Sequence, residues 1–165
     1  MVESLSERDM ENLLTAVGIA RRSREHGNHP FGAVLAEPGG RVLLEAENTV
    51  ITGRDATGHA ETNLVRLASA GYDAEFLRGC TLYTGTEPCA MCAGAIYWGN
   101  IGRVVYALGE DELLALTGAD PENPTMALPC RAVFAAGQRA LSVIGPIELA
   151  EARAVHDGFW RGRPA

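Results

Sequence analysis

Apolar residues along this chain alternate between two spacings, one typical of amphipathic helices and one typical of short strands. Between Met10 and Val17 they recur every three or four residues, which predicts a first helix with Ser6 as its N-cap and Gly27 as its end. Elsewhere, β-branched and aromatic residues gather in short runs bounded by Gly and Pro, which predicts strands. The expected helices cover residues 7–25, 59–70, 89–98 and 147–160, and the expected strands cover residues 31–37, 41–47, 80–84, 103–107 and 141–144.

The order of these elements predicts an α/β domain with a mixed sheet. The first two strands flank a Pro-Gly-Gly turn and should form an antiparallel hairpin, whereas the later strand-helix-strand unit should be parallel. Residues 48–58 and the proline-bearing residues 118–129 are expected to be loops. A length of 165 residues fits a single domain over 1–165, in which residues 145–165 form a C-terminal helix suited to serve as a lid or as a segment swapped between subunits.

The charge and composition narrow the classes of function. All fourteen basic residues are Arg, so Lys-based Schiff-base chemistry and a phosphate-loop Lys are excluded, and no G-x-S-x-G elbow is present. The net charge is −7, and the arginines are spread from Arg8 to Arg163. Because nucleic-acid affinity depends on clustered positive charge, we expect a small-molecule partner rather than a polynucleotide.

The N-terminus and the cysteines indicate a compartment. Acidic residues stand where a signal peptide needs a basic start, and the longest uncharged stretch, residues 88–102, is too short to span a bilayer. We therefore expect a cytoplasmic protein without a membrane segment. Its four cysteines then favour metal-binding, catalytic or buried thiols over disulfides.

Two short motifs carry candidate chemistry, and each lies at the start of an expected helix. The first is His59-Ala60-Glu61, and the second is Pro88-Cys89-Ala90-Met91-Cys92. Cysteines three residues apart share one face of a helix, so both sulfurs can reach one ion. Two thiolates and an imidazole select zinc, and three protein ligands leave a fourth position open for a water or hydroxide. Glu61 would then move protons for hydrolytic deamination.

Other interpretations of the same residues stay open at this point. A CxxC pair on a strand-to-helix turn also occurs in redox modules, although that function gives His59 and Glu61 no role. A structural zinc site would need a fourth ligand, for which Cys80 and Cys130 are the remaining thiols; both are otherwise expected to be buried. His29 is expected to be a loop or cap residue, or else a group at a pocket edge.

The two motifs together resemble the cytidine-deaminase-like superfamily of zinc enzymes. The likeness is greatest to the branch of bacterial guanine deaminases and tRNA adenosine deaminases. Three stretches carry it: Asn28-His-Pro-Phe-Gly-Ala-Val-Leu35, Thr57-Gly-His-Ala-Glu61 and Thr81 to Trp98. The resemblance covers roughly residues 8–108 and fades beyond them.

This resemblance implies a fold, a cofactor and a set of roles. The fold would be a three-layer α/β/α arrangement around a five-stranded mixed sheet. One zinc ion per chain would be held by His59, Cys89 and Cys92, with water or hydroxide as the fourth ligand. Glu61 matches the proton shuttle. Members of the superfamily are usually dimers or larger, so a homodimer is expected.

The resemblance also assigns residues to the substrate. Asn48 lies eleven residues before His59, where this branch binds the purine, and the backbone N–H of Ala60 lies where the family contacts a ring carbonyl. Phe31 matches an aromatic residue of the base pocket, and Trp98 stands in a context typical of guanine deaminases. Structural alternatives remain for these positions: a turn residue for Asn48, and core aromatic residues for Phe31 and Trp98.

The resemblance also implies an acidic residue that guanine deaminases supply from their C-terminal third. Counting from the thiolates places it near Asp120, although the surrounding sequence departs from that family. The other acidic residues nearby are rivals, with solvated surface charges as the default interpretation. They are Glu110, Asp111, Glu112 and Glu122.

The sequence therefore predicts a zinc-dependent aminohydrolase of a free nucleobase or related amino-heterocycle. Guanine, converted to xanthine and ammonia, is the first candidate substrate. The alternatives are adenosine in tRNA, cytosine or a modified pyrimidine, a nucleoside, or a non-enzymatic zinc-binding or redox module.

Overall fold

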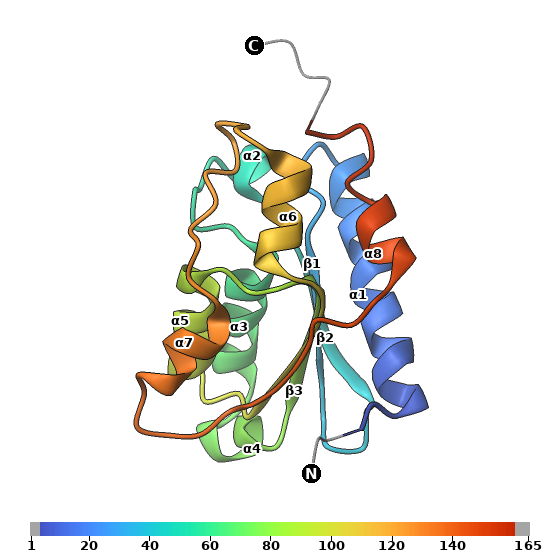
Figure 1. Cartoon of the computed structure of the whole chain (residues 1–165). Coiled ribbons are helices and arrows are strands. Elements are labelled where there is room, and N and C mark those ends of the chain that lie inside the picture. Colours follow the sequence, from blue (N-terminus) through green and yellow to red (C-terminus); the bar gives the residue numbers. More distant parts are fainter. Residues whose placement is uncertain (1–3, 161–165) are drawn as a thin grey trace.

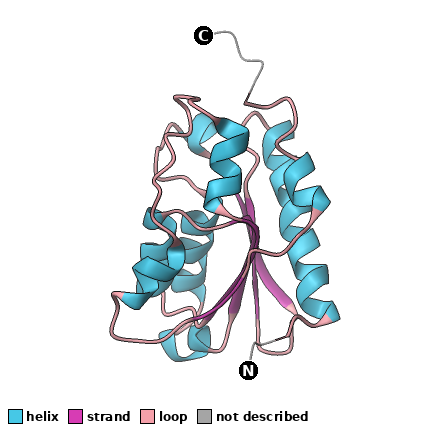
Figure 2. Ribbon diagram, viewed as in Figure 1, coloured by secondary structure: helices cyan, strands magenta, loops and turns pink. Residues whose placement is uncertain are grey.

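A computed structural model describes residues 4–160 of the chain, and its helices and strands alternate through most of that range (Figures 1 and 2). The elements in chain order are α1 (Glu7–Glu25), β1 (Gly32–Ala36), β2 (Val42–Glu47), α2 (Val50–Gly53), α3 (Ala60–Gly71), α4 (Ala74–Arg78), β3 (Thr81–Thr86), α5 (Ala90–Trp98), β4 (Arg103–Leu108), α6 (Glu110–Thr117), α7 (Cys130–Ala135), β5 (Ser142–Ile144) and α8 (Ala150–Ala154).

The strands form a five-stranded mixed sheet in the order β2-β1-β3-β4-β5. Strand β1 is antiparallel to both β2 and β3, whereas β3, β4 and β5 are parallel to one another. Helices α1 and α8 cover one face, and α3, α5 and α7 cover the other (Figure 1). The predicted three-layer fold and the predicted strand directions are therefore confirmed.

Two apolar clusters hold the layers together, one on each face of the sheet. In β4, Val104 belongs to the cluster beneath α3, α5 and α7, and its neighbour Val105 belongs to the cluster beneath α1. This alternation follows from the two-residue period of a strand, and it makes the central strands apolar throughout. Helix α1 packs so closely on β1 that a Cβ at Gly32 would lie 2.5 Å from the carbonyl oxygen of Ala16.

The start of α1 is fixed by a reciprocal cap. The Ser6 side chain accepts from the Asp9 N–H at 3.1 Å, and the Asp9 carboxylate accepts from the Ser6 N–H at 2.9 Å. An aspartate thus completes the capping box that more often uses Glu or Gln. The expected helix over residues 7–25 is confirmed.

The strand directions bring several loops to one edge of the sheet. Because β3 and β4 are parallel, their C-terminal ends at Thr86 and Leu108 are neighbours. Strand β1 runs the opposite way, so its N-terminal end at Phe31 lies at the same edge. Strand β2, antiparallel to β1, ends there at Glu47. Segments distant in the sequence are thereby gathered around one point.

The C-terminal third departs from the sequence predictions. In place of a helix over residues 147–160, α8 spans only Ala150–Ala154 and is followed by turns in which Gly158 has a φ of +67°. A residue with positive φ ends a right-handed helix. His156, which lies in these turns, is 3% exposed. Helices α6 and α7 were not predicted, nor was the single turn α2 within the expected loop.

No helix within residues 4–160 has the length and hydrophobicity that crossing a bilayer requires.

Candidate active site

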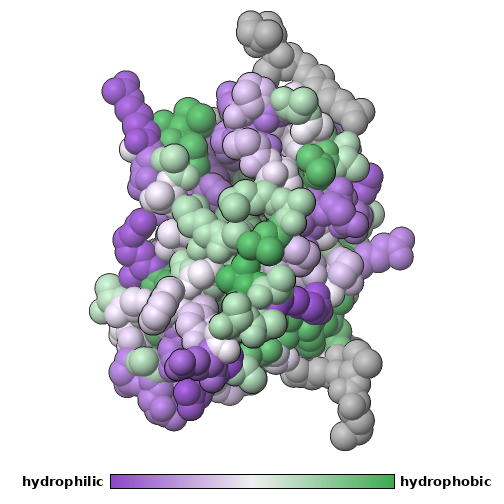
Figure 3. Space-filling view, turned by 60° about the vertical axis from the view of Figure 1, so that its left-hand side comes forward, coloured by the Kyte–Doolittle hydropathy of each residue, from purple (hydrophilic) through white to green (hydrophobic). Residues whose placement is uncertain are grey.

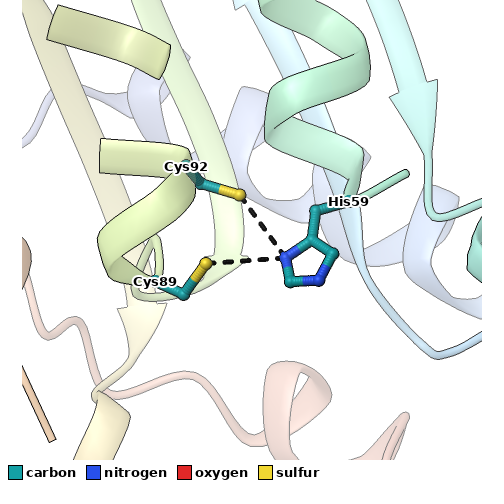
Figure 4. Close-up of side chains that lie close together, drawn as sticks. All are labelled: His59, Cys89 and Cys92. Carbon is teal, nitrogen blue, oxygen red and sulfur yellow. Dashed lines mark hydrogen bonds between the residues drawn. The ribbon is translucent and has the colours of Figure 1, made fainter. Parts of the chain in front are cut away.

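The two cysteines and the histidine of the sequence motifs converge at helix N-termini. His59 is the N-cap of α3, Cys89 is the N-cap of α5, and Cys92 lies in the first turn of α5. Figure 4 shows the three side chains pointing toward one another, with both sulfurs 3.5 Å from His59 Nδ1. Their candidate ligand atoms all lie within 4.8 Å of one another, close enough to surround one ion.

The chemistry of this donor set fits zinc. It offers one imidazole nitrogen and two sulfurs. Because the sulfurs are shielded from solvent, a bound cation would stabilise their negative charge. A hydrogen bond from Cys92 lowers the pKa of Cys89 to about 4, whereas the same bond, together with burial, raises the pKa of Cys92. Without a metal, the two cysteines therefore form one thiolate and one thiol. A bound dication would stabilise a thiolate at the second cysteine as well.

Glu61 lies beside these donors and is almost fully buried, at 5% exposure. Its Oε1 accepts from the Thr84 hydroxyl at 2.7 Å, and its Oε2 accepts from the Cys92 thiol at 3.5 Å. Burial raises the pKa of Glu61, so this carboxyl group takes up a proton more readily than an exposed glutamate. Both features suit a group that accepts and returns protons.

A cavity of about 330 Å³ opens beside the His59 and Cys89 side chains. That volume lies in the range of small-molecule sites, about 300–1,000 Å³. The acidic residues that line it are all glutamates, and no arginine is among the described residues at its wall. The acidic members are Glu61, Glu87, Glu110 and Glu122.

Three of these acids differ in what they contact. The Glu87 carboxylate accepts from the backbone N–H groups of Glu110 and Cys130, at 3.0 and 2.9 Å, so it joins the thiolate loop to the starts of α6 and α7. Burial and the nearby Cys89 raise the pKa of Glu110 to about 7. Glu122 Oε2 lies 2.9 Å from His29 Nε2. Glu110 and Glu122 are thus the two acids that the C-terminal third brings to the cavity.

The predicted substrate residues fall into two groups. Phe31 lines the cavity, and Ala60 is the first residue of α3, where backbone N–H groups have no partner within the helix. Asn48 is 1% exposed and does not line the cavity; its Oδ1 accepts from the N–H of Val50, which does. Asn48 therefore lies next to the wall.

Trp98 and Asp120 are placed away from the cavity. Trp98 is 85% exposed at the end of α5. Asp120 accepts from the Glu122 N–H at 2.9 Å and so shapes the loop that carries Glu122. Among its rivals, Glu110 and Glu122 line the cavity, while Asp111 and Glu112 do not.

Sequence reasoning left His29, Cys80 and Cys130 with two interpretations each, and it did not place the loop of residues 118–129 at the cavity. His29, expected first as a loop or cap residue, lines the cavity and is 4% exposed. No periodic signal marks the loop that carries Glu122 and Met126, so only the fold places it there. Cys80 and Cys130 are buried thiols outside the group of three ligands, which leaves a structural four-ligand site without its fourth sulfur among residues 4–160.

Comparison with known proteins agrees with this fold and site. Residues 6–108 match the cytidine and deoxycytidylate deaminase zinc-binding region. The chain belongs to this family of zinc-dependent deaminases, which are hydrolases acting on C–N bonds.

Three similar proteins are named for different substrates. A probable cytosine deaminase of Schizosaccharomyces pombe is 39% identical over 158 residues, 96% of each chain. The structure of a guanine deaminase from Nitrosomonas europaea superposes with a TM-score of 0.75 and 25% identity, over 93% of this chain and 85% of that one. A structure from work on A-to-I editing by tRNA deaminases superposes with a TM-score of 0.69 and 30% identity, over 88% and 99%.

Proposed function

We propose that this protein deaminates a free nucleobase by hydrolysis, with guanine as the first candidate. The observation that carries the proposal is a cavity beside the His59, Cys89 and Cys92 group whose wall carries four glutamates and, among the described residues, no arginine. Carboxylates accept hydrogen bonds from ring N–H groups. They repel phosphate, and the described wall offers no arginine to attract it.

The residues of the site divide the chemistry among them. His59, Cys89 and Cys92 would hold zinc, which, when bound, would make water acidic enough to act as a nucleophile at neutral pH. Glu61 takes the proton released as water adds to the amidine carbon. It passes this proton to the ring nitrogen, then takes the remaining proton from the added hydroxyl group and passes it to the departing amino group. The C–N bond breaks, ammonia leaves, and a ring carbonyl remains.

Fixed neighbours keep Glu61 in position for this work. The Thr84 hydroxyl donates a hydrogen bond to Oε1 at 2.7 Å, and Oε2 faces Cys92. Because the group is buried, its raised pKa helps it retain the proton between the two transfers.

The substrate would lie between an aromatic wall and the acids of the C-terminal third. Phe31 offers a ring for the face of the base, and the N–H of Ala60 offers a donor for its carbonyl. Glu110 and Glu122 would accept from ring N–H groups. In a nucleoside, the sugar replaces the hydrogen on one ring nitrogen. An acid that accepts a hydrogen bond at that nitrogen therefore selects the free base.

Cytosine is the second candidate. The supporting observation is the likeness of the whole chain, including its C-terminal third, to a probable cytosine deaminase. Guanine is placed first because it presents more ring N–H groups than cytosine to the two acids, Glu110 and Glu122. A tRNA substrate is disfavoured by the net charge of −7 and by the acidic cavity.

The assembly that we propose is a homodimer formed through the exposed side of α5. Met91 and Trp98, seven residues apart on that helix, are 37% and 85% exposed. Figure 3 shows apolar side chains across the face of the molecule that carries α5 and α7. We expect Trp98→Glu to convert the dimer to a monomer in analytical ultracentrifugation. A wild-type monomer at micromolar concentration would contradict this assembly.

Ammonia release from a substrate panel tests the function. The zinc-loaded protein is assayed with guanine, cytosine, guanosine, cytidine and an adenosine-containing tRNA anticodon stem, and each product is identified by mass. We expect turnover of guanine and at least 100-fold lower kcat/KM for guanosine, a discrimination of about 3 kcal/mol. Turnover of cytosine alone would select the second candidate, and turnover of only the tRNA or a nucleoside would overturn the free-base proposal.

A further inference from the structure

Residues 155–160 fold back against the base of the cavity rather than continuing α8. His156, Phe159 and Trp160 are 3%, 7% and 5% exposed. The Trp160 indole Nε1–H donates to His156 Nδ1 at 3.0 Å, and the two rings are stacked. The segment therefore forms a compact aromatic unit of its own.

This aromatic unit contacts two residues that line the cavity. The Phe31 ring lies 5.5 Å from the His156 ring and 6.1 Å from the Trp160 ring, between centroids. The His29 ring lies 5.4 Å from the Trp160 ring. His156 and Trp160 are not themselves part of the cavity wall. They support the wall from behind.

His29 transmits this support to an acid of the cavity. One side of its ring packs against Phe159 and Trp160, and its Nε2 lies 2.9 Å from Glu122 Oε2. Glu122 belongs to the long loop of residues 118–129, which has no regular structure to fix its side chains. The packed His29 ring thus helps to hold the Glu122 carboxylate at the cavity wall.

Arg24, in the last turn of α1, holds the segment in place. Its Nη1 donates to the carbonyl oxygens of Val155 and Asp157, at 2.9 and 2.7 Å. Its guanidinium also lies 5.4 Å from the centre of the Phe159 ring. Two hydrogen bonds and a ring contact from one side chain join the C-terminal segment to the first helix.

We propose that residues 155–160 are a positioning element of the substrate pocket, held by Arg24, which acts on the substrate through Phe31, His29 and Glu122. The proposal rests on the proposed function, since the pocket must bind a base. Because this element lies on the side of Phe31 and His29, away from the thiolates, its loss should weaken base binding without affecting the metal ligands or Glu61.

Steady-state kinetics of two variants test the role. Arg24→Met removes the side chain that bonds residues 155–160 to α1. Trp160→Leu removes the ring that contacts both His29 and Phe31. We expect each to raise KM about tenfold or more while kcat changes by less than about twofold and zinc content is unchanged. Trp160→Phe keeps a ring and should restore KM to within about threefold of wild type. The matched control is Arg22→Met, on the same helix, which should change neither constant.

A spectroscopic measurement separates this proposal from the choice of substrate. In the ¹⁵N spectrum of the zinc-loaded protein, His29, assigned with His29→Gln, should show a bonded Nε2 that reverts to solvent-exposed values in Arg24→Met. If no nucleobase is turned over but this change occurs, the proposed function fails while the contact of segment and wall stands. An unchanged His29 signal in Arg24→Met, or an unchanged KM in a folded Trp160→Leu protein, would overturn the positioning role.

Discussion

The two parts of the chain on either side of Leu108 contribute differently to the same site. The part before it supplies His59, Glu61 and the two cysteines, all on regular elements that pack on the sheet. The part after it supplies Glu110 and Glu122 from a helix start and a long loop. The side chains suited to the reaction thus lie on rigid elements of the first part, whereas the two acids of the second part come from a helix start and an irregular loop.

This division follows from what each task requires. Metal ligands and a proton shuttle must keep fixed distances, which helix N-termini seated on a sheet provide. A pocket wall can change with its loop while the reaction stays the same. The structures from work on a guanine deaminase and on tRNA deaminases share the fold of this chain, although those proteins are named for different substrates.

The largest effect is expected for the shuttle in the first part. Glu61→Gln keeps the shape of the side chain but removes its ability to accept a proton, so kcat should fall by about 1,000-fold or more. Zinc content, measured by elemental analysis, should be unchanged. The control Glu112→Gln alters an exposed glutamate and should retain full activity. Substantial turnover by Glu61→Gln would remove this residue from the mechanism.

The thiolates should show a combined loss of metal and stability. Cys92→Ala leaves an imidazole and one sulfur, so zinc binding should weaken by several orders of magnitude, and the melting temperature should drop because metal binding is coupled to folding. Cys80→Ala is the matched control, since both thiols are fully buried but only Cys92 belongs to the candidate metal group. Equal zinc content in both variants would contradict the assignment of Cys92 as a ligand.

The same boundary separates what the sequence could predict from what it could not. The elements up to Leu108 carry strong local signals: helical spacing in α1, strands bounded by Gly and Pro, and cysteines spaced to share a helix face. Even there, the short helices α2 and α4 were not predicted.

Beyond Leu108, position depends on contacts between distant residues. The pairing of Glu122 with His29 spans 93 residues, and counting along the chain selected Asp120 in its place. The aromatic residues after α8 fitted a helical pattern, yet tertiary packing against Phe31 and the turn at Gly158 decided their conformation. No periodicity encodes either contact.

The choice between Glu122 and Asp120 gives a sharper test of the second part. Glu122→Gln should raise KM about 10- to 100-fold, because a carboxylate acceptor is replaced by an amide that can also donate. Asp120→Asn should raise it by less than about threefold, since the new side chain can still accept from the Glu122 N–H. KM and kcat are measured for the base that the panel identifies. A larger effect at Asp120 would restore the prediction made from the sequence.

The remaining prediction concerns the stability of the C-terminal segment at acidic pH. Burial lowers the pKa of His156 from 6.5 to about 4. Between those values the unfolded chain binds a proton that the folded protein does not, so stability falls with decreasing pH, by up to about 1.4 kcal/mol per unit. His156→Gln removes this proton while keeping an acceptor for the Trp160 indole. In urea unfolding of the variant, the free energy should decline less steeply than wild type from pH 6.5 to 4, while the two slopes agree above pH 7. If the two curves of unfolding free energy against pH were parallel throughout, His156 would have the same pKa in the folded and unfolded states. The segment would then be open to solvent.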